Sequence, residues 1–378
     1  MRVKPSEVYF FDERKHFDLL QGLERLWEEA GLASLIGSGD RVAVKVHMGE
    51  LGNVTHVRPP FVAKIVELVR KAGGKPFVTD TTTIYPGGRF TASAYLETAA
   101  FNGFTQQTVG APIIIADGEK GFTGERFPVR RRIEGCGLGE VEVASALLEA
   151  DMVLVVSHAK GHLLSGFGGA LKNLAMGCTT KRTKAKQHEA HGVVLDSSKC
   201  SRCLECVKAC PYQALEETPE GPPKRLASKC FYCLTCLFNC PSDAYKLERR
   251  GKERFQVALA HAATAVAEAL PKIAYISFIH NVTLYCDCAA AGAPILEDVG
   301  FLASLDPVAI DKASLDLIDQ AGVRGRIGVK PPDILGKLNG TSSLRHVETA
   351  YRLGLGSLEY RLVEVKLREE RKVLEEEG

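Results

Sequence analysis

Eight cysteines repeat one spacing within a single stretch of the chain. Each half of the stretch reads C-x2-C-x2-C-x3-C-P. The cysteines are Cys200, Cys203, Cys206 and Cys210 in the first half, and Cys230, Cys233, Cys236 and Cys240 in the second. Thiolates are soft ligands, and four of them suit a 4Fe–4S cluster. The spacing therefore predicts two such clusters, held by one segment.

The spacing also predicts how the cysteines are shared. Three closely spaced cysteines wrap around one cluster, whereas the fourth lies farther along the chain and reaches the other cluster. One cluster is then bound by Cys200, Cys203, Cys206 and Cys240, and the other by Cys230, Cys233, Cys236 and Cys210. Zinc is the alternative, because C-x2-C pairs also bind zinc. Zinc requires neither a tight third cysteine nor a Cys-Pro in both halves.

Residues 196–247 resemble the two-cluster 4Fe–4S ferredoxins through these two cysteine runs. The resemblance implies that each cluster carries one electron at low potential. The repeat places the clusters side by side, so that electrons can pass between them. The segment therefore indicates a protein that moves electrons, or one that uses clusters to hold a fold.

A second stretch contains residue types that could bind a ligand or react. It spans residues 157–177, SHAKGHLLSGFGGALKNLAMG. Glycines let the backbone approach a ligand closely and expose N–H groups, and lysines beside them suit a carboxylate or phosphate. The residues expected to bind a small anionic molecule are Gly166, Gly168, Gly169, Lys172 and Asn173. Neither a Walker loop nor a dinucleotide fingerprint is present. A tight glycine-rich turn into a helix is the alternative.

Four side chains in or after this stretch are candidates for catalysis, by proton transfer or substrate positioning: His158, Lys160, His162 and His188. His188 shortly precedes the first cysteine run, so we expect it between the glycine-rich loop and the nearer cluster. The alternative for His188 is a surface histidine without a role.

Another pair of thiols, Cys286 and Cys288, flanks Asp287. Two thiols at this spacing can bind a metal or react. Inert buried thiols are the commoner case.

These residues must be positioned by a chain that alternates apolar strands with helices. Strands are predicted at residues 6–11, 41–47, 76–80, 112–117, 151–158 and 272–280, and helices at 19–31, 60–72, 143–150, 253–270, 306–320 and 362–377. The alternation favours an α/β fold, with a mostly parallel sheet covered by helices on both faces.

Ligands of open parallel sheets bind outside the carboxyl ends of the strands. The polar residues at these ends are His47, Asp80, Asp117, His158, His280 and Asn281. We expect at least two of them to line a common cleft. For Asp80 and Asp117, capping of the next turn is the alternative.

The cysteine-rich segment interrupts the α/β pattern. Residues 1–195 and 250–378 are therefore expected to form one α/β domain, with an α+β two-cluster ferredoxin-like module at 196–249 inserted in it. Insertions of this kind occur in exposed loops.

The bulk numbers restrict partners and location. The 378 residues carry a net charge of +2, so no nucleic-acid partner is implied. No apolar run reaches the length of a membrane span, and the first twenty residues lack the apolar core of a signal peptide. Twelve cysteines in such a chain indicate metal binding in the reducing cytoplasm.

Residues 155–177 also resemble the family called domain of unknown function 362, through their SHAKGH and GGALKNLAMG segments. Residues 42–47 and 298–311 extend the resemblance, and Asp306 and Asp311 match its signature. Members of this family often carry an inserted or appended two-cluster ferredoxin module. The resemblance implies the architecture and the site loops, but no substrate and no role for the two aspartates.

The leading hypothesis is an iron–sulphur oxidoreductase that exchanges electrons with a soluble donor or acceptor protein and with a small anionic molecule in the α/β cleft. One alternative is a ferredoxin-like electron carrier whose α/β domain docks a partner enzyme. Another is a metal- or cluster-handling maturation factor that uses Cys286, Cys288 and the histidines to hold a labile metal. In a fourth hypothesis the clusters are purely structural.

Overall fold

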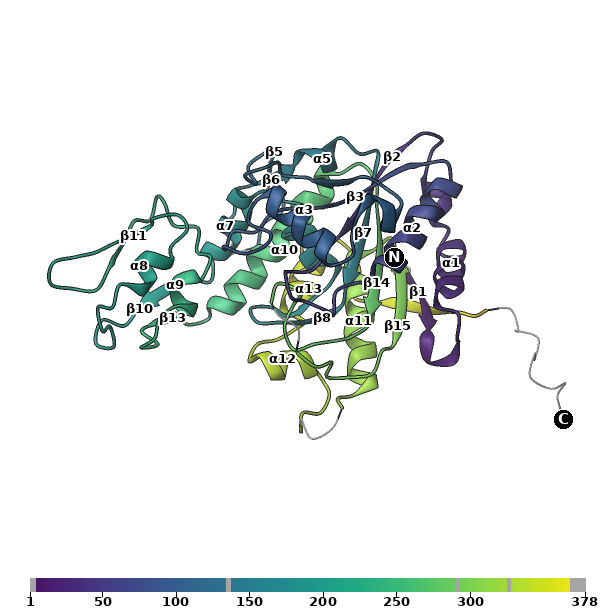
Figure 1. The fold of residues 1–378 in the computed structure, drawn as a ribbon. Coiled ribbons are helices and arrows are strands. Elements are labelled where there is room, and N and C mark those ends of the chain that lie inside the picture. The colour runs from purple at the N-terminus through teal and green to yellow at the C-terminus, as the bar shows by residue number, and fades with distance from the viewer. Residues whose placement is uncertain (1–4, 134–136, 290–291, 325–327, 368–378) are drawn as a thin grey trace.

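The described residues contain an eight-stranded sheet that runs through the middle of the molecule (Figure 1). The computed structural model describes residues 5–133, 137–289, 292–324 and 328–367. In spatial order the strands are β16 (Tyr360–Val365), β1 (Ser6–Asp12), β15 (Gly300–Ser304), β14 (Ile273–Ile279), β7 (Met152–His158), β2 (Arg41–Val46), β3 (Lys75–Asp80) and β4 (Ile113–Ile115). Among them, β15 alone runs antiparallel to its neighbours. The predicted mostly parallel α/β fold is confirmed.

The central strands are apolar on both sides because helices cover both faces of the sheet. On β2, Val42 and Val44 belong to one core, whereas Ala43 belongs to the other. On β7, Leu154 and Val153 are divided in the same way. Successive side chains of a strand point to opposite faces, so the continuous apolar runs of the sequence build two cores.

Helices α1 (Leu19–Glu29) and α2 (Pro59–Lys71) pack on one face. Asp18 caps α1 by accepting a hydrogen bond from the Gln21 N–H at 2.9 Å, and proline opens α2. The other face carries α6 (Ala170–Ala175), α10 (Gly251–Ala269), α11 (Pro307–Ala321) and α13 (Arg345–Arg352).

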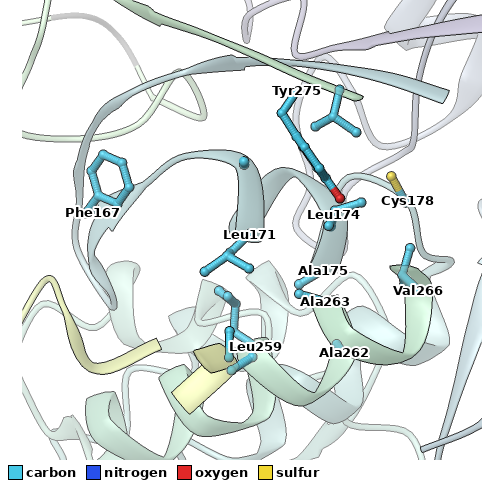
Figure 2. Close-up of a cluster of buried hydrophobic side chains, with 14 of the residues drawn as sticks. Phe167, Leu171, Leu174, Ala175, Cys178, Leu259, Ala262, Ala263, Val266 and Tyr275 are labelled. Carbon is cyan, nitrogen blue, oxygen red and sulfur yellow. The ribbon is translucent and has the colours of Figure 1, made fainter. Parts of the chain in front are cut away.

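Helix α6 lies between the sheet and α10, and this packing fixes the glycine-rich stretch in place. Figure 2 shows Leu171 of α6 next to Leu259 of α10, and Leu174 of α6 beside Tyr275 of β14. The alanines of α10 let the two helices approach closely. The helix that follows the glycine-rich loop is therefore held by the core.

The cysteine-rich segment projects from one side of the sheet, at the left of Figure 1. Its elements are β10 (Val193–Leu195), α8 (Glu205–Ala209), β11 (Leu215–Glu216), β12 (Lys224–Arg225), α9 (Thr235–Phe238) and β13 (Tyr245–Leu247). Strands β10 and β13 pair antiparallel, with Val193 opposite Leu247. The chain therefore enters and leaves the segment side by side.

The remaining elements support loops around the sheet. They are β5 (Gly124–Pro128), β6 (Glu140–Ala144), β8 (Lys160–His162), β9 (Gly166–Gly168), α3 (Ala92–Phe101), α4 (Gln106–Val109), α5 (Ser145–Leu148), α7 (Lys181–Glu189), α12 (Ile334–Asn339), and the 3-10 turns η1 (Glu13–Lys15) and η2 (Leu32–Leu35). Across the part of the chain that is described, no helix combines the length and the hydrophobicity that a membrane crossing requires.

Two predicted helices differ from the structure. The helix expected at 143–150 is shorter, because β6 continues to Ala144 before α5 begins. The helix expected at 362–377 is wrong at its start, where β16 pairs in parallel with β1; residues 368–378 lie outside the described residues. Val363 and Val365 flank the exposed Glu364 and are less exposed than it, which suits an edge strand with one solvated side.

Candidate functional site

A cavity of about 180 Å³ opens at the carboxyl ends of three neighbouring parallel strands. His47 follows β2, Asp80 ends β3 and His158 ends β7, and all three line the cavity. The order β7-β2-β3 makes these strand ends adjacent. Open α/β sheets bind ligands in this position. The volume suits a small molecule, since a cavity of about 150 Å³ holds benzene.

Most of the site residues predicted from the sequence line this cavity. They are His158, Lys160, His162, Gly168, Gly169, Lys172, Asn173 and His188. Gly166 lies outside the lining and packs against Ser343, where a Cβ would come within 2.6 Å of the serine hydroxyl. Its backbone has φ +71°, so the position favours glycine for steric reasons.

Three of the strand-end residues do not reach the cavity. Asp117 accepts a hydrogen bond from the Thr82 N–H at 3.0 Å and shapes the turn after β3. His280 pairs with Glu13 on the other side of the sheet. The Asn281 N–H donates to the Asp298 carboxylate at 2.5 Å. The capping interpretation therefore describes Asp117.

A buried ion pair forms the floor of the cavity. The Lys45 ammonium lies 2.7 Å from the Asp80 carboxylate and donates to the Asn173 side-chain oxygen at 2.6 Å. Burial alone would raise the pKa of Asp80, but Lys45, with help from His47 and Arg89, holds it below its usual value. Asp80 is therefore a carboxylate that fixes the lysine, and Lys45 in turn orients Asn173.

Asp287 joins two of the predicted catalytic residues. Its carboxylate accepts from the Lys160 ammonium and lies 2.9 Å from Nδ1 of His158. Nε2 of His158 faces the carbonyl of His280. Burial, and then Lys160, lower the pKa of His158, whereas the Asp287 carboxylate opposes this effect. Because both ring nitrogens face acceptor oxygens of the protein, His158 positions Asp287 and turns neither nitrogen towards a ligand.

His162 is held as a neutral ring with a defined tautomer. The backbone N–H groups of Leu164 and Ser165 donate to its Nδ1 at 3.3 and 3.1 Å. Nδ1 therefore carries no proton, and the neutral ring keeps its proton on Nε2. Burial, and then the Lys172 ammonium, lower the pKa of His162 well below its usual value. The ring is an N–H donor at the cavity wall.

His188 connects the cavity to the neighbouring His191. Its Nδ1 lies 3.3 Å from Nε2 of His191, and Phe255 packs edge-on against its ring. Burial, and then His191, lower the pKa of His188 well below its usual value. His188 is therefore neutral at neutral pH.

The cavity wall carries more positive than negative charge. The cations that line it are Lys45, Arg89, Lys160, Lys172 and Lys184, and the carboxylates are Asp80 and Asp287. Arg89 pairs with Glu50 at 3.1 Å, and Lys184 lies 3.6 Å from Asp117. Lys172 forms no ion pair with any described residue. Its ammonium is the natural partner for a bound anion.

Sequence reasoning missed three of these charged residues, namely Lys45, Arg89 and Lys184. A signal was present for Lys45, since it interrupts the apolar run of β2. A lysine inside a strand that is buried on both faces requires an anionic partner. Arg89 and Lys184 reach the cavity from a loop and from α7, and no local pattern marks them.

Cys286 and Cys288 also line the cavity, on opposite sides of Asp287. Both are free thiols of intermediate exposure. The Sγ of Cys288 lies 3.5 Å from Nε2 of His47. The thiol pair therefore faces the same space as Lys172 and His162.

The cysteine-rich segment forms two further small cavities. Cys200, Cys203, Cys206 and Cys240 line one, and Cys210, Cys230, Cys233 and Cys236 line the other. Each cavity thus takes its fourth cysteine from the opposite half of the repeat. Within the described residues, no group of three or more His, Cys, Asp or Glu side chains is arranged to hold a single metal ion.

The backbone of the two halves repeats as closely as the cysteines do. Non-glycine residues with positive φ occur in pairs thirty positions apart: Arg202 and Tyr232, Leu204 and Leu234, Gln213 and Asp243. The N–H groups of Ala214 and Ala244 donate to the sulphurs of Cys210 and Cys240, both at 3.3 Å. Left-handed residues turn a short loop tightly, so the sulphurs of each loop face inward.

Tyr212 links one of these cavities to the cavity of the sheet. It lines the cavity of Cys210 and Cys230, and its hydroxyl donates to the Ile84 carbonyl at 2.7 Å. Ile84 lines the sheet cavity. Tyr212 also stacks on Phe231, with ring centroids 4.0 Å apart. We call Cys210, Cys230, Cys233 and Cys236 the proximal quartet, and Cys200, Cys203, Cys206 and Cys240 the distal quartet.

Asp306 and Asp311 cap helices. Asp306 caps α11 by accepting from two of its first N–H groups at 2.8 and 2.9 Å. Asp311 accepts from the N–H groups of Ala170 and Leu171 at 2.6 and 3.0 Å. It therefore ties α11 to the start of α6, one residue before Lys172.

The carboxyl of Asp311 should make stability depend on pH. Burial raises its pKa to about 7, although two N–H groups oppose the shift. A raised folded-state pKa contributes stability that is complete below about pH 4 and is lost as pH rises to about 7. The effect corresponds to about 4 kcal/mol. In urea unfolding from pH 4 to pH 8, Asp311→Asn should flatten this decline. Parallel profiles for the variant and the wild type would contradict it.

A family model described as "Domain of unknown function (DUF362)" matches residues 42–316. The chain belongs to this family. The DUF362 match extends from β2 into α11 and includes the cavity-lining residues of β2, β3, β7 and α6. The predicted family membership is thereby confirmed.

Comparison with individual proteins gives partial matches. A thylakoid-associated protein of Synechocystis sp. is 27% identical over 178 residues, which cover 46% of this chain and 50% of that protein. The chain thus spans about half the length of the curated relative it matches. A solved Thermotoga maritima protein gives a TM-score of 0.38 at 11% identity, over 69% of this chain and 50% of the other. The lactate racemase apoprotein of Thermoanaerobacterium thermosaccharolyticum gives a TM-score of 0.33 at 12% identity, over 72% of this chain and 50% of the other.

Proposed function

We propose that this DUF362 protein binds two 4Fe–4S clusters and passes electrons between a soluble partner protein and a small anionic molecule in the sheet cavity. One observation carries the proposal. Tyr212 lines the proximal-quartet cavity and hydrogen-bonds to Ile84, which lines the sheet cavity. Electron transfer weakens steeply with distance, so a path of two residues, Tyr212 and Ile84, between the two cavities supports a redox role over a purely structural one.

The two cysteine quartets fit clusters of this kind. Their donors are all thiols, and each quartet lines a cavity of its own. Backbone N–H groups donate to Cys210 and Cys240, and hydrogen bonds to sulphur tune cluster potentials. In a cubane each iron takes one protein sulphur, so the four thiols need not converge on a single ion. Bound there, the clusters would supply single electrons at low potential.

The exposure of the distal quartet indicates where a partner protein docks. Cys203 is exposed, whereas the proximal quartet contacts the α/β part through Tyr212. A soluble donor or acceptor therefore meets the distal quartet, and the cavity ligand meets the proximal one.

Within the sheet cavity, the side chains of this chain bind and orient the anion. Lys172 supplies an ammonium without a carboxylate partner among the described residues. His162 supplies an Nε2–H donor, because its Nδ1 is occupied by backbone N–H groups. Lys160 and His158 hold Asp287 and act as positioning residues.

The proposal is tested on the full chain, purified without oxygen. We expect about eight iron atoms per chain and a visible absorption that a low-potential reductant bleaches. A panel of 2-oxo carboxylates, unsaturated carboxylates and carboxylate-bearing disulfides should then include a compound that restores the absorption. A colourless, iron-free protein would overturn the proposal. So would reduced clusters that no compound in the panel reoxidises in the wild type faster than in Lys172→Gln.

A further inference from the structure

The two cavity thiols are held rigidly by the residue between them. The Asp287 carboxylate binds Lys160 and His158, and its carbonyl accepts from the Glu50 N–H at 2.9 Å. With the central residue fixed on three sides, Cys286 and Cys288 both remain on the cavity wall. These contacts of Asp287 explain where the two thiols lie. They do not give the thiols themselves a role in stabilising the fold.

His47 presents a proton to one of the two sulphurs. The Gly49 N–H donates to Nδ1 of His47 at 3.0 Å, so the neutral ring carries its proton on Nε2. Nε2 lies 3.5 Å from the Sγ of Cys288. A hydrogen bond from a ring N–H stabilises a thiolate, and the same group can later return a proton.

The surroundings distinguish the two thiols. The Cys286 thiol, and then Arg89, His47 and Lys172, hold the pKa of Cys288 well below its usual value although burial opposes them. The pKa of Cys286 is raised well above its usual value by Cys288 and by burial. Reactive cysteines occur in such electropositive, partly exposed sites. One thiolate thus lies beside one thiol.

We propose that Cys286 and Cys288 form a redox-active dithiol that reduces a small anionic disulfide in the cavity, with Cys288 as the attacking thiolate. This inference rests on the proposed function only for its supply of electrons. It names the substrate class of the same cavity, which the redox proposal leaves open.

The chemistry balances in two exchanges. The Cys288 thiolate attacks one sulphur of the substrate disulfide, forming a mixed disulfide and releasing one substrate thiolate. Cys286 then loses its proton and attacks the Sγ of Cys288, which closes a Cys286–Cys288 disulfide and releases the second substrate thiol. The pair loses two electrons and the one proton of Cys286, so the substrate leaves as one thiol and one thiolate, and the thiolate takes its proton from solvent. Regeneration of the thiolate and thiol takes two electrons and one proton, and two one-electron centres hold that number of electrons.

The cavity sets the class of disulfide. Lys172 favours a substrate with a carboxylate or phosphate group, and the volume of about 180 Å³ limits its size. A disulfide closed across a single residue is strained and therefore easily reduced again.

A single-turnover experiment tests the dithiol. The wild-type holoprotein is reduced with a thiol reagent that leaves low-potential clusters oxidised, freed of reductant and mixed without oxygen with dithiodiglycolate, a small dianionic disulfide. We expect two substrate thiols released per chain and a Cys286–Cys288 peptide lighter by two hydrogens in mass spectrometry. The neutral bis(2-hydroxyethyl) disulfide should react at least about tenfold more slowly than dithiodiglycolate. Equal rates for the two disulfides would overturn the anionic assignment.

Matched variants assign the two sulphurs. Cys286→Ser should release one thiol and retain a stable adduct on Cys288, whereas Cys288→Ser should release none. Cys178→Ala, which changes a buried core thiol, should behave as wild type. Wild-type release by Cys288→Ser would overturn the proposal, and so would the absence of an adduct in folded Cys286→Ser. Iron content and circular dichroism verify that each variant is folded.

The two proposals fail in different ways. Single turnover needs no electron donor, so it reports the dithiol even if the iron content is zero. Conversely, Cys286→Ser should keep about eight iron atoms and remain reducible by a donor. Repeated turnover that needs both the donor and the thiol pair supports the two proposals together.

Discussion

Replacing Cys200 and Cys240 together by alanine should leave about four iron atoms per chain, whereas replacing Cys200 and Cys210 together should leave almost none. The reason is that the cavities pair the cysteines crosswise. Cys200 and Cys240 line the same cavity although they lie in different halves of the repeat. Cys200 and Cys210 lie in the same half but line different cavities.

Iron and acid-labile sulphide measured on protein purified without oxygen decide this prediction. If each half held its own cluster, the two double variants would exchange their results.

The single variant Cys210→Ala should also lose reaction with the cavity ligand by at least about a hundredfold, because it disrupts the proximal quartet. Cys240→Ala should keep that reaction when a small chemical reductant replaces the partner protein. Cys178→Ala serves as the control that keeps all of its iron.

Lys172→Gln should weaken the binding of a small dianion by about 10- to 100-fold, which corresponds to roughly 1.4–2.8 kcal/mol. Lys172 has no carboxylate partner among the described residues, so its ammonium remains available to a bound anion. Burial alone would lower the pKa of Lys172, but Cys286 and Cys288 raise it above its usual value. The folded protein therefore stabilises the ammonium, and Lys172→Gln should leave Tm unchanged or lower it slightly.

Calorimetric titration with dithiodiglycolate and thermal unfolding give the two readouts. Lys186→Gln is the matched control, because Lys186 is exposed on α7 and, among the residues that the structure describes, pairs with Glu189 alone. Lys172→Arg should recover part of the affinity. Unchanged affinity in Lys172→Gln would show that the anion is not bound by this ammonium. A protein that acts only as an electron carrier would also show unchanged affinity.

The elements that the sequence predicted well are those whose periodicity is strong. β2 and β7 are continuous apolar runs, and α2 and α11 begin at prolines. β15 escaped prediction because its apolar run is short, and periodicity does not indicate that a strand runs antiparallel. The charged residues of β16 continue into a charged terminal stretch, and this pattern predicts a helix where the structure has a strand.

The strand-end rule located the cavity but not all of its residues. It placed His47, Asp80 and His158 together, because β2, β3 and β7 are adjacent and parallel. It failed for His280, since the side chain after β14 points to the opposite face of the sheet and packs on Phe61. Which face a terminal side chain occupies depends on the pleat and on where the strand ends, and a shift of one residue reverses it.

The neck formed by β10 and β13 has a consequence for the history of the fold. Because Val193 and Leu247 are paired neighbours, the intervening residues could be deleted and the ends rejoined by a short turn without rethreading the sheet. The entropy of closing a loop changes slowly with its length, so the stability of the α/β core depends little on the length of the segment between β10 and β13. Such a junction lets an ancestral sheet acquire, exchange or discard an entire accessory unit in one recombination event.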